Sequence, residues 1–236
     1  MTFFNISPIN FNIPQISFRS TATYSPPIKG EPYSDGFTSN PIYENYGSES
    51  EILAEAKSNP RIKEILSKYK IPLKLNMQEL NQLKRGHMRE TRVIAAQIYS
   101  ALPKEMKAEI NLPDLQEAAM FHDYGKVLIP ASILNKAGGL TEEEHEIMQL
   151  HSELSYELLK NQNLSKDALN MIRNHHDTGD NLGAQILSTA DKYSALREDR
   201  CYKEPLSREQ ALAIIKEDVD NGIIAPEVYE ALKKSV

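Results

Sequence analysis

The chain has 236 residues, of which 40% are hydrophobic and 25% charged, values typical of one globular domain or of one domain with an appendage. A formal net charge of −6 argues against a nucleic-acid-binding protein, because non-specific binding to DNA depends on an excess of Lys and Arg. The single cysteine, Cys201, excludes an intramolecular disulfide, and no apolar run reaches the roughly 18 residues of a membrane span. We therefore expect a cytoplasmic protein that binds neither DNA nor a membrane.

Residues 1–48 differ in composition from the rest of the chain. They contain six of the thirteen prolines and five of the six phenylalanines but only five charged residues. Repeated Pro, Asn and Ser interrupt any helical or strand period. The composition predicts a disordered or low-complexity N-terminal tail. Its aromatic side chains are candidate anchors for a protein partner, and a solvated tail is the alternative.

Helical patterns begin after this tail. Residues 49–75 are predicted to form a leading segment, with a helix over 51–69 that ends before Pro72. Residues 76–236 are predicted to form the main domain, which opens with a helix over 77–102. One face of that helix carries an apolar stripe in which a histidine is included. The stripe consists of Leu80, Leu83, His87, Ile94 and Ile98.

The later helices are predicted mainly from their first residues. Proline at a first helical position and Ser or Thr followed by Glu or Gln three residues later are both helix-start signals. The predicted starts are Pro113, Thr141 with Glu144, Ser165, Leu182, Ser207 with Gln210, and Pro226. The helix from Leu182 is expected to run to Arg197, and Gly222 is expected to close the one before Pro226. No convincing strand pair is present, so the fold class is predicted to be all-α.

Five of the six histidines form an ordered series with two aspartates. The series is His87, His122, Asp123, His151, His175, His176 and Asp191. A neutral imidazole and a bridging carboxylate suit a cluster of first-row transition metals. Each residue alone could be a hydrogen-bonded core residue, but burying all seven without a metal would cost several kcal/mol. His145 lies six positions before His151, roughly 240° around the helix, and is therefore expected to face solvent.

The pair His122-Asp123 is followed at once by Gly125 and Lys126. Adjacent helical residues point about 100° apart, so both can reach one metal cluster only near a helix end. Gly125 is expected to give the backbone freedom to turn and to leave room for a substrate. Lys126 places a cation suited to a phosphate oxygen beside the site.

Two stretches carry a family resemblance. HDYGKVLIPASILNKAGGLTEEEHEIMQLH and ADKYSALREDRCYKEPLSREQA resemble blocks of the HD superfamily of metal-dependent phosphohydrolases, most closely its HD-GYP branch, and the resemblance covers roughly residues 76–236. It implies an all-α HD-domain helical bundle with a dinuclear metal site, with iron or manganese as the typical ions. Asp123 would bridge the two ions. One ion would be held by His87, His122 and Asp191, and the other by His151, His175 and His176.

The same resemblance implies an activity. The chain would be a phosphodiesterase that hydrolyses a cyclic dinucleotide such as cyclic di-GMP, or a related signalling nucleotide, through a metal-bridging hydroxide. Asp123 and Lys126 would be catalytic, and Lys126, Arg200 and Lys203 match positions that contact substrate phosphates. The alternatives are a phosphomonoesterase acting on a nucleotide or small phosphate ester, and a non-catalytic HD module that binds a nucleotide or a protein.

The sequence departs from the HD-GYP pattern in three places. Only fourteen residues, DTGDNLGAQILSTA, separate His176 from Asp191, so the Gly-Tyr-Pro loop that lines the cyclic dinucleotide pocket in that branch is missing. Leu83 lies one helical turn before His87, where some members carry a metal-binding Glu, which predicts two metal ions and not three. Asp177 follows the histidine pair where the branch commonly has Glu.

Overall fold

The computed structural model describes residues 47–198 and 205–236. Within these ranges the chain forms helices and no strand, which confirms the predicted all-α class. The predicted tail lies outside the described residues except for Gly47 and Ser48. None of the described helices is long and apolar enough to cross a membrane.

The predicted helix over 51–69 is two helices, α2 (Glu49–Ser58) and α3 (Pro60–Lys68). Pro60 cannot donate a backbone hydrogen bond inside a helix, so the chain breaks before it. The buried Asn59 caps α3, since its side-chain oxygen accepts hydrogen bonds from the backbone N–H groups of Arg61 at 2.9 Å and Ile62 at 3.1 Å. Its amide group donates to Glu157 in α9, which fastens this corner to the domain.

The predicted helix over 77–102 is also divided. Its parts are α4 (Met77–Arg85) and α5 (His87–Ala101), and they meet at Gly86. The backbone of Gly86 has φ −107° and ψ −101°, far from helical values of about −63° and −42°. Glycine is among the poorest helix formers, so the break falls at the residue that holds the helix least strongly. The break makes His87 the first residue of α5.

The next part of the chain is built from short helices. These are α6 (Lys104–Lys107), α7 (Leu112–Phe121), the 3-10 helix η1 (Tyr124–Leu128) and α8 (Ala131–Leu134). Pro113 lies in the first turn of α7, within one residue of the predicted start. His122 and Asp123 occupy the turn between α7 and η1, so the predicted helix end at this pair is confirmed.

The last five helices begin where their capping residues predict. They are α9 (Glu142–Leu159), α10 (Lys166–Asn174), α11 (Leu182–Arg197), α12 (Arg208–Asp220) and α13 (Pro226–Ser235). The capping boxes Thr141–Glu144 and Ser207–Gln210 are both formed. Gly222, with φ +70°, follows α12 as predicted.

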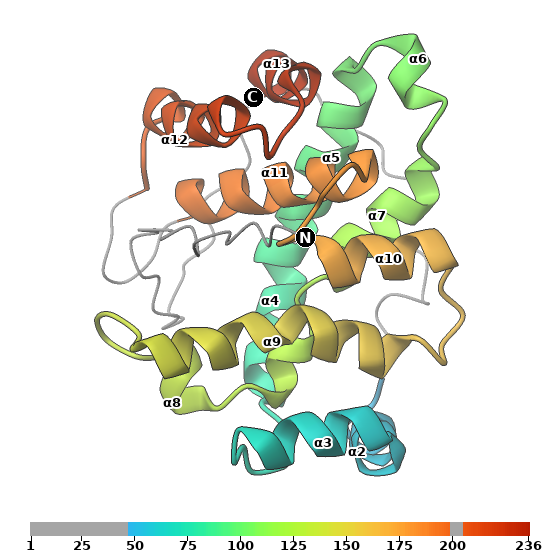
Figure 1. Ribbon diagram of the computed structural model, residues 1–236, viewed down its shortest axis with the longest axis vertical. Helices are drawn as coiled ribbons and strands as arrows, with labels where there is room; N and C mark the ends of the chain where they lie inside the picture. The colour runs from blue at the N-terminus through green and yellow to red at the C-terminus, as the bar shows by residue number, and fades with distance from the viewer. Residues whose placement is uncertain (1–46, 199–204) are drawn as a thin grey trace, which may run out of the picture.

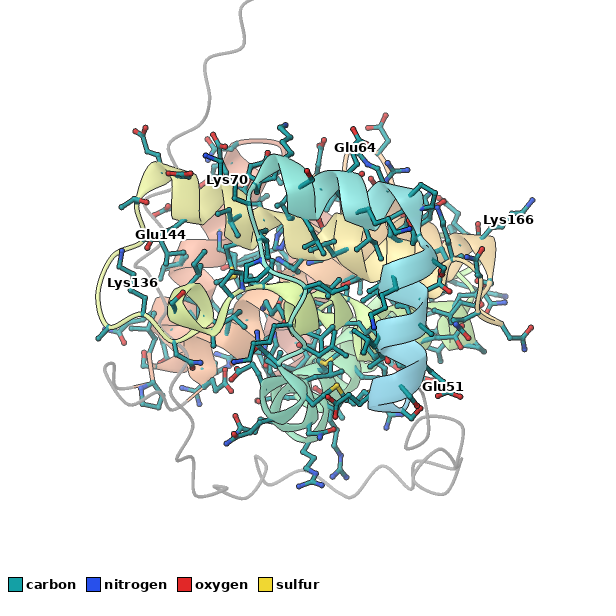
Figure 2. All side chains as sticks on the ribbon, turned by 90° about the horizontal axis from the view of Figure 1, so that it is seen from below. Glu51, Glu64, Lys70, Lys136, Glu144 and Lys166 are labelled. Carbon is teal, nitrogen blue, oxygen red and sulfur yellow. The ribbon has the colours of Figure 1, made fainter. Side chains whose placement is uncertain are left out.

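Helix α5 runs through the middle of the molecule and packs against α4, α7, α11 and α13 (Figure 1). Helix α9 packs against η1 on one side and against α10 on another. Seen from below, α2 and α3 lie over α9, and Glu64 of α3 points away from the molecule (Figure 2). This arrangement brings the start of α5, the ends of α7 and α10, and the middles of α9 and α11 toward one another.

Candidate metal centre

Five helices carry the seven predicted residues to one place. His87 begins α5, the pair His122-Asp123 directly follows α7, and the pair His175-His176 directly follows α10. His151 lies in the middle of α9 and Asp191 in the middle of α11. These helices are spread over residues 87–197, so the meeting results from the packing of the bundle.

Six of the seven residues fall into two groups. Within each group the nitrogen or oxygen atoms that can bind a metal lie within 4.8 Å of one another. The first group is His87, His122 and Asp191, and the second is His151, His175 and His176. This division is the one that the resemblance implies for two ions, and it follows from the geometry alone.

Asp123 lies between the two groups and faces both. Its Oδ2 is 3.6 Å from Nε2 of His87 and 3.5 Å from Nε2 of His122, in the first group. Its Oδ1 is 3.2 Å from Nε2 of His151, in the second. One carboxylate therefore offers a separate oxygen to each group, which is what a bridging ligand requires.

Three of the histidines are held in the same tautomer. In His122, His151 and His175, Nδ1 lies 2.9, 2.6 and 2.7 Å from the backbone carbonyl oxygen of the residue three positions earlier. A carbonyl oxygen only accepts hydrogen bonds, so each Nδ1 must carry the proton. In each neutral ring Nε2 then has a lone pair aimed at the centre. Such hydrogen bonds from the other ring nitrogen are typical of metal-ligating histidines.

The two Nε2 atoms of His151 and His175 are 3.2 Å apart. Both rings are buried, and burial lowers the pKa of each to about 3, so both are neutral near pH 7. With the ring protons on Nδ1, the 3.2 Å contact sets two lone pairs against each other with no hydrogen between them. A cation accepting both lone pairs makes this arrangement favourable.

His122 gives a second sign of an electrophile. Its Nε2 is buried and has no hydrogen-bond partner among the described residues, although Asp123 and Asp191 each place an oxygen at 3.5 Å. Burial by itself lowers the pKa of this ring, but the two carboxylates outweigh burial and raise it to about 10. A proton on Nε2 thus occupies, in the metal-free protein, the position that a metal ion would take.

Lys126 lies against the bridging carboxylate. It is buried, and its Nζ is 2.6 Å from Oδ2 of Asp123. Burial would raise the pKa of Asp123, but Lys126 and His122 hold it well below its usual range. The predicted phosphate-binding cation is therefore at the site.

The predicted room for a substrate beside Gly125 is wrong. A Cβ atom at this position would lie 2.3 Å from the backbone oxygen of His151 and 2.5 Å from the backbone nitrogen of Ser155. The space beside Gly125 is filled by the backbone of α9 and is not left open for a substrate. Glycine is required because η1 and α9 pack backbone against backbone.

The remaining predicted residues are placed as follows. Arg200 and Lys203 lie outside the described residues. His145 is half-buried, so the expectation that it faces solvent is wrong in degree, and it belongs to neither group. Leu83 is buried in the core. His176 is the one exposed member of the two groups.

Two buried serines support the centre and were not predicted to do so. Ser194, one turn after Asp191, bonds Nδ1 of His87 at 3.2 Å, while Nε2 of His87 lies 2.7 Å from Asp191. Ser155, one turn after His151, bonds the turn that carries Asp123. Their sequence signal is a serine on the buried face of a ligand-bearing helix, one turn beyond the ligand.

Comparison with known proteins agrees with this geometry. Residues 85–196 match the family model of the HD domain. The match includes all seven residues of the candidate centre, and its His and Asp groups are suited to bind divalent metal ions.

Its relatives are phosphodiesterases of cyclic dinucleotides. The chain is 32% identical to a cyclic di-GMP phosphodiesterase of Thermotoga maritima, over 54% of this chain and 38% of that protein. It is 32% identical to 3′3′-cGAMP-specific phosphodiesterase 3 of Vibrio cholerae, over 52% of this chain and 29% of that protein. It is 37% identical to a cyclic di-GMP phosphodiesterase response regulator of Xanthomonas campestris pv. campestris, over 43% of this chain and 31% of that protein. The matches thus span well under half of each relative.

Proposed function

We propose that this chain is a metal-dependent phosphodiesterase that binds two divalent ions, iron or manganese, and hydrolyses a cyclic dinucleotide or a related signalling nucleotide. The observation that carries the proposal is the pair of opposed Nε2 atoms of His151 and His175, 3.2 Å apart in rings whose protons are held elsewhere. The two oxygens of Asp123, directed at separate groups, support two ions bridged by one carboxylate.

The donor set fits these ions. Five imidazole nitrogens and two carboxylates suit iron or manganese, and the chain offers no thiolate among the described residues that would favour a softer site. Two such ions, when bound, lower the pKa of a water molecule and neutralise charge on a phosphoryl group.

The roles of the chain's own residues follow from their contacts. Asp123 would tie the two groups together, and the carbonyl bonds to Nδ1 keep the lone pairs of His122, His151 and His175 directed inward. Lys126 places an ammonium group at the bridging carboxylate, where it can donate to a phosphate oxygen as charge develops. Phosphate contacts from Arg200 and Lys203 stay predictions, as do a cytoplasmic location and a protein partner for residues 1–48.

The substrate class is inferred from the names of the relatives, which include cyclic di-GMP and 3′3′-cGAMP phosphodiesterases. A phosphomonoesterase is the second candidate. It is favoured by the fourteen-residue connection between His176 and Asp191, because a shorter loop leaves a more open site. The two candidates share the metal centre and differ in what the surrounding surface recognises.

The test is metal analysis followed by a substrate panel on the same anaerobically loaded sample. We expect close to two ions per chain and hydrolysis of cyclic di-GMP or 3′3′-cGAMP, faster than hydrolysis of cyclic mononucleotides or nitrophenyl phosphate. Turnover of monoesters only would reject the diesterase proposal in favour of the second candidate. Less than one ion per chain would reject both and favour a non-catalytic HD module.

A further inference from the structure

The turn that carries Asp123 is fastened to α9 by one side chain. The hydroxyl of Ser155 accepts a hydrogen bond from the backbone N–H of Gly125 at 2.7 Å. It donates its own hydrogen to the backbone oxygen of His122, also at 2.7 Å. A serine hydroxyl has one proton to donate, so both bonds form together without competition. Ser155 is fully buried, which strengthens both bonds and makes them costly to lose.

These two bonds lie where Gly125 packs directly against the backbone of α9. A side chain at Gly125 would collide with backbone atoms of both His151 and Ser155, so no larger residue fits between the two segments. His151 stands one helical turn before Ser155 on α9. The contact that Ser155 makes therefore determines where Asp123 sits relative to His151, whose Nε2 lies 3.2 Å from Oδ1 of Asp123.

The first group of ligands depends less on this contact. His87 is held by Ser194 and Asp191, which come from α11. The ring of His122 is oriented within its own helix, by its Nδ1 bond to the carbonyl oxygen of Ala119. Asp123 alone must reach from the turn to α9.

We infer that Ser155 is a positioning residue for the ion held by His151, His175 and His176. It sets the reach of the bridging carboxylate Oδ1 toward that group and leaves the His87–His122–Asp191 group largely unaffected. The inference rests on the proposed function, since it presupposes two metal sites.

The experiment is an anaerobic titration of the metal-free full chain with Co(II), followed by visible absorption. The unchanged protein is expected to show two binding phases, and His176→Ala identifies the phase that belongs to the second group. In Ser155→Ala that phase should weaken about 10- to 100-fold, as is typical when a residue behind a metal ligand is removed, with altered absorption bands. The other phase should keep the affinity that it has in the unchanged protein.

Ser152→Ala is the matched control. Ser152 lies on the same helix, and among the described residues its hydroxyl donates a hydrogen bond only to the backbone oxygen of Gln149, at 3.2 Å, so both phases should stay as in the unchanged protein. Superimposable titrations of Ser155→Ala and the unchanged protein would overturn the inference. Equal weakening of both phases, with a lower melting temperature of the metal-free variant, would also overturn it, because Ser155 would then support the fold and not one site. Absence of cobalt uptake by the unchanged protein would instead overturn the proposed function.

Discussion

Removal of the metal ions should make the fold sensitive to acid. Burial lowers the pKa of His151 and of His175 to about 3, from an ordinary value of 6.5. Both rings regain the ordinary pKa when the chain unfolds, so between pH 6.5 and about 3 the unfolded state binds more protons than the folded one. Stability from these rings is therefore fully present above pH 6.5 and is lost as the pH falls.

The size of the effect follows from the two pKa values. Each ring lowers the unfolding free energy by about 1.4 kcal/mol per pH unit once the pH is well below the pKa of that ring in the unfolded chain. Together the two rings remove several kcal/mol of unfolding free energy between pH 6.5 and about pH 4.5, and His176, whose pKa burial also lowers to about 3, adds to this loss. A folded domain is stable by only about 5–15 kcal/mol, so the metal-free protein should be close to unfolding near pH 4.5.

His122 acts in the opposite direction. Its pKa is raised to about 10 in the folded protein, because Asp123 and Asp191 outweigh burial. Its contribution is present below pH 6.5 and is lost as the pH rises toward 10. The metal-free protein should thus be most stable near neutral pH. Saturating metal should raise the unfolding free energy at that pH, because the metal binds only the folded state.

The assay is urea unfolding, followed by far-ultraviolet circular dichroism, at a series of pH values in the presence of a chelator. His151→Gln removes one of the three rings whose pKa burial lowers to about 3, and it should reduce the loss of unfolding free energy between pH 6.5 and 4.5. His145→Gln replaces a histidine outside both groups and serves as the control variant. If the unfolding free energy falls equally steeply with pH in His151→Gln and in the unchanged protein, the buried ring of His151 is not a source of the acid sensitivity.

Three further substitutions test the centre and its frame. Asp123→Ala should abolish both metal uptake and turnover, because one carboxylate faces both groups. His145→Ala should alter neither. Two ions retained by Asp123→Ala, counted by elemental analysis, would contradict a bridging role. Gly125→Ala should lower the unfolding free energy by about 1–3 kcal/mol, since its Cβ meets the backbone of α9, and an unchanged urea midpoint would show that the turn can move away. Asn59→Ala should lower the unfolding free energy by about 1–2 kcal/mol through loss of the α3 cap, and turnover should be preserved. Ser58→Ala, at the exposed neighbouring residue, is the control. Equal stability of the two variants would show that the cap contributes nothing.

Helix starts were predictable where a side chain caps its own helix. Thr141 with Glu144, Ser165, and Ser207 with Gln210 form their bonds within three residues, so the pattern carries the whole cause. The break before Pro60 has a sequence signal in the proline itself, whereas the break at Gly86 was missed for a different reason. The apolar stripe of Leu80, Leu83 and His87 continues across Gly86, and periodicity does not register a single residue that leaves the helical conformation.

The seven residues of the candidate centre could be predicted from the sequence. The hydrogen bonds that hold them in place could not. The seven residues could be chosen because burying so many imidazoles and carboxylates needs a cation. The bond from Ser155 to Gly125 joins residues thirty positions apart and exists only once η1 packs on α9. For the same reason the sequence suggested an open space at Gly125, where the fold places the backbone of a neighbouring helix.

The exposed position of His176 shows on which side the candidate centre is accessible. His151 and His175 in the same group are buried, so the accessible edge of that group is at the end of α10. The connection from there to α11 is a tight turn, in which Asn181 caps α11 and the Thr178 hydroxyl reaches the carbonyl oxygen of Ile223 at 3.4 Å. The chain between the two groups thus packs against the α12–α13 corner. Because this connection is held by packing, the proposed function predicts that surfaces elsewhere around His176 distinguish cyclic dinucleotides from monoesters, which the substrate panel tests independently of the metal-binding residues.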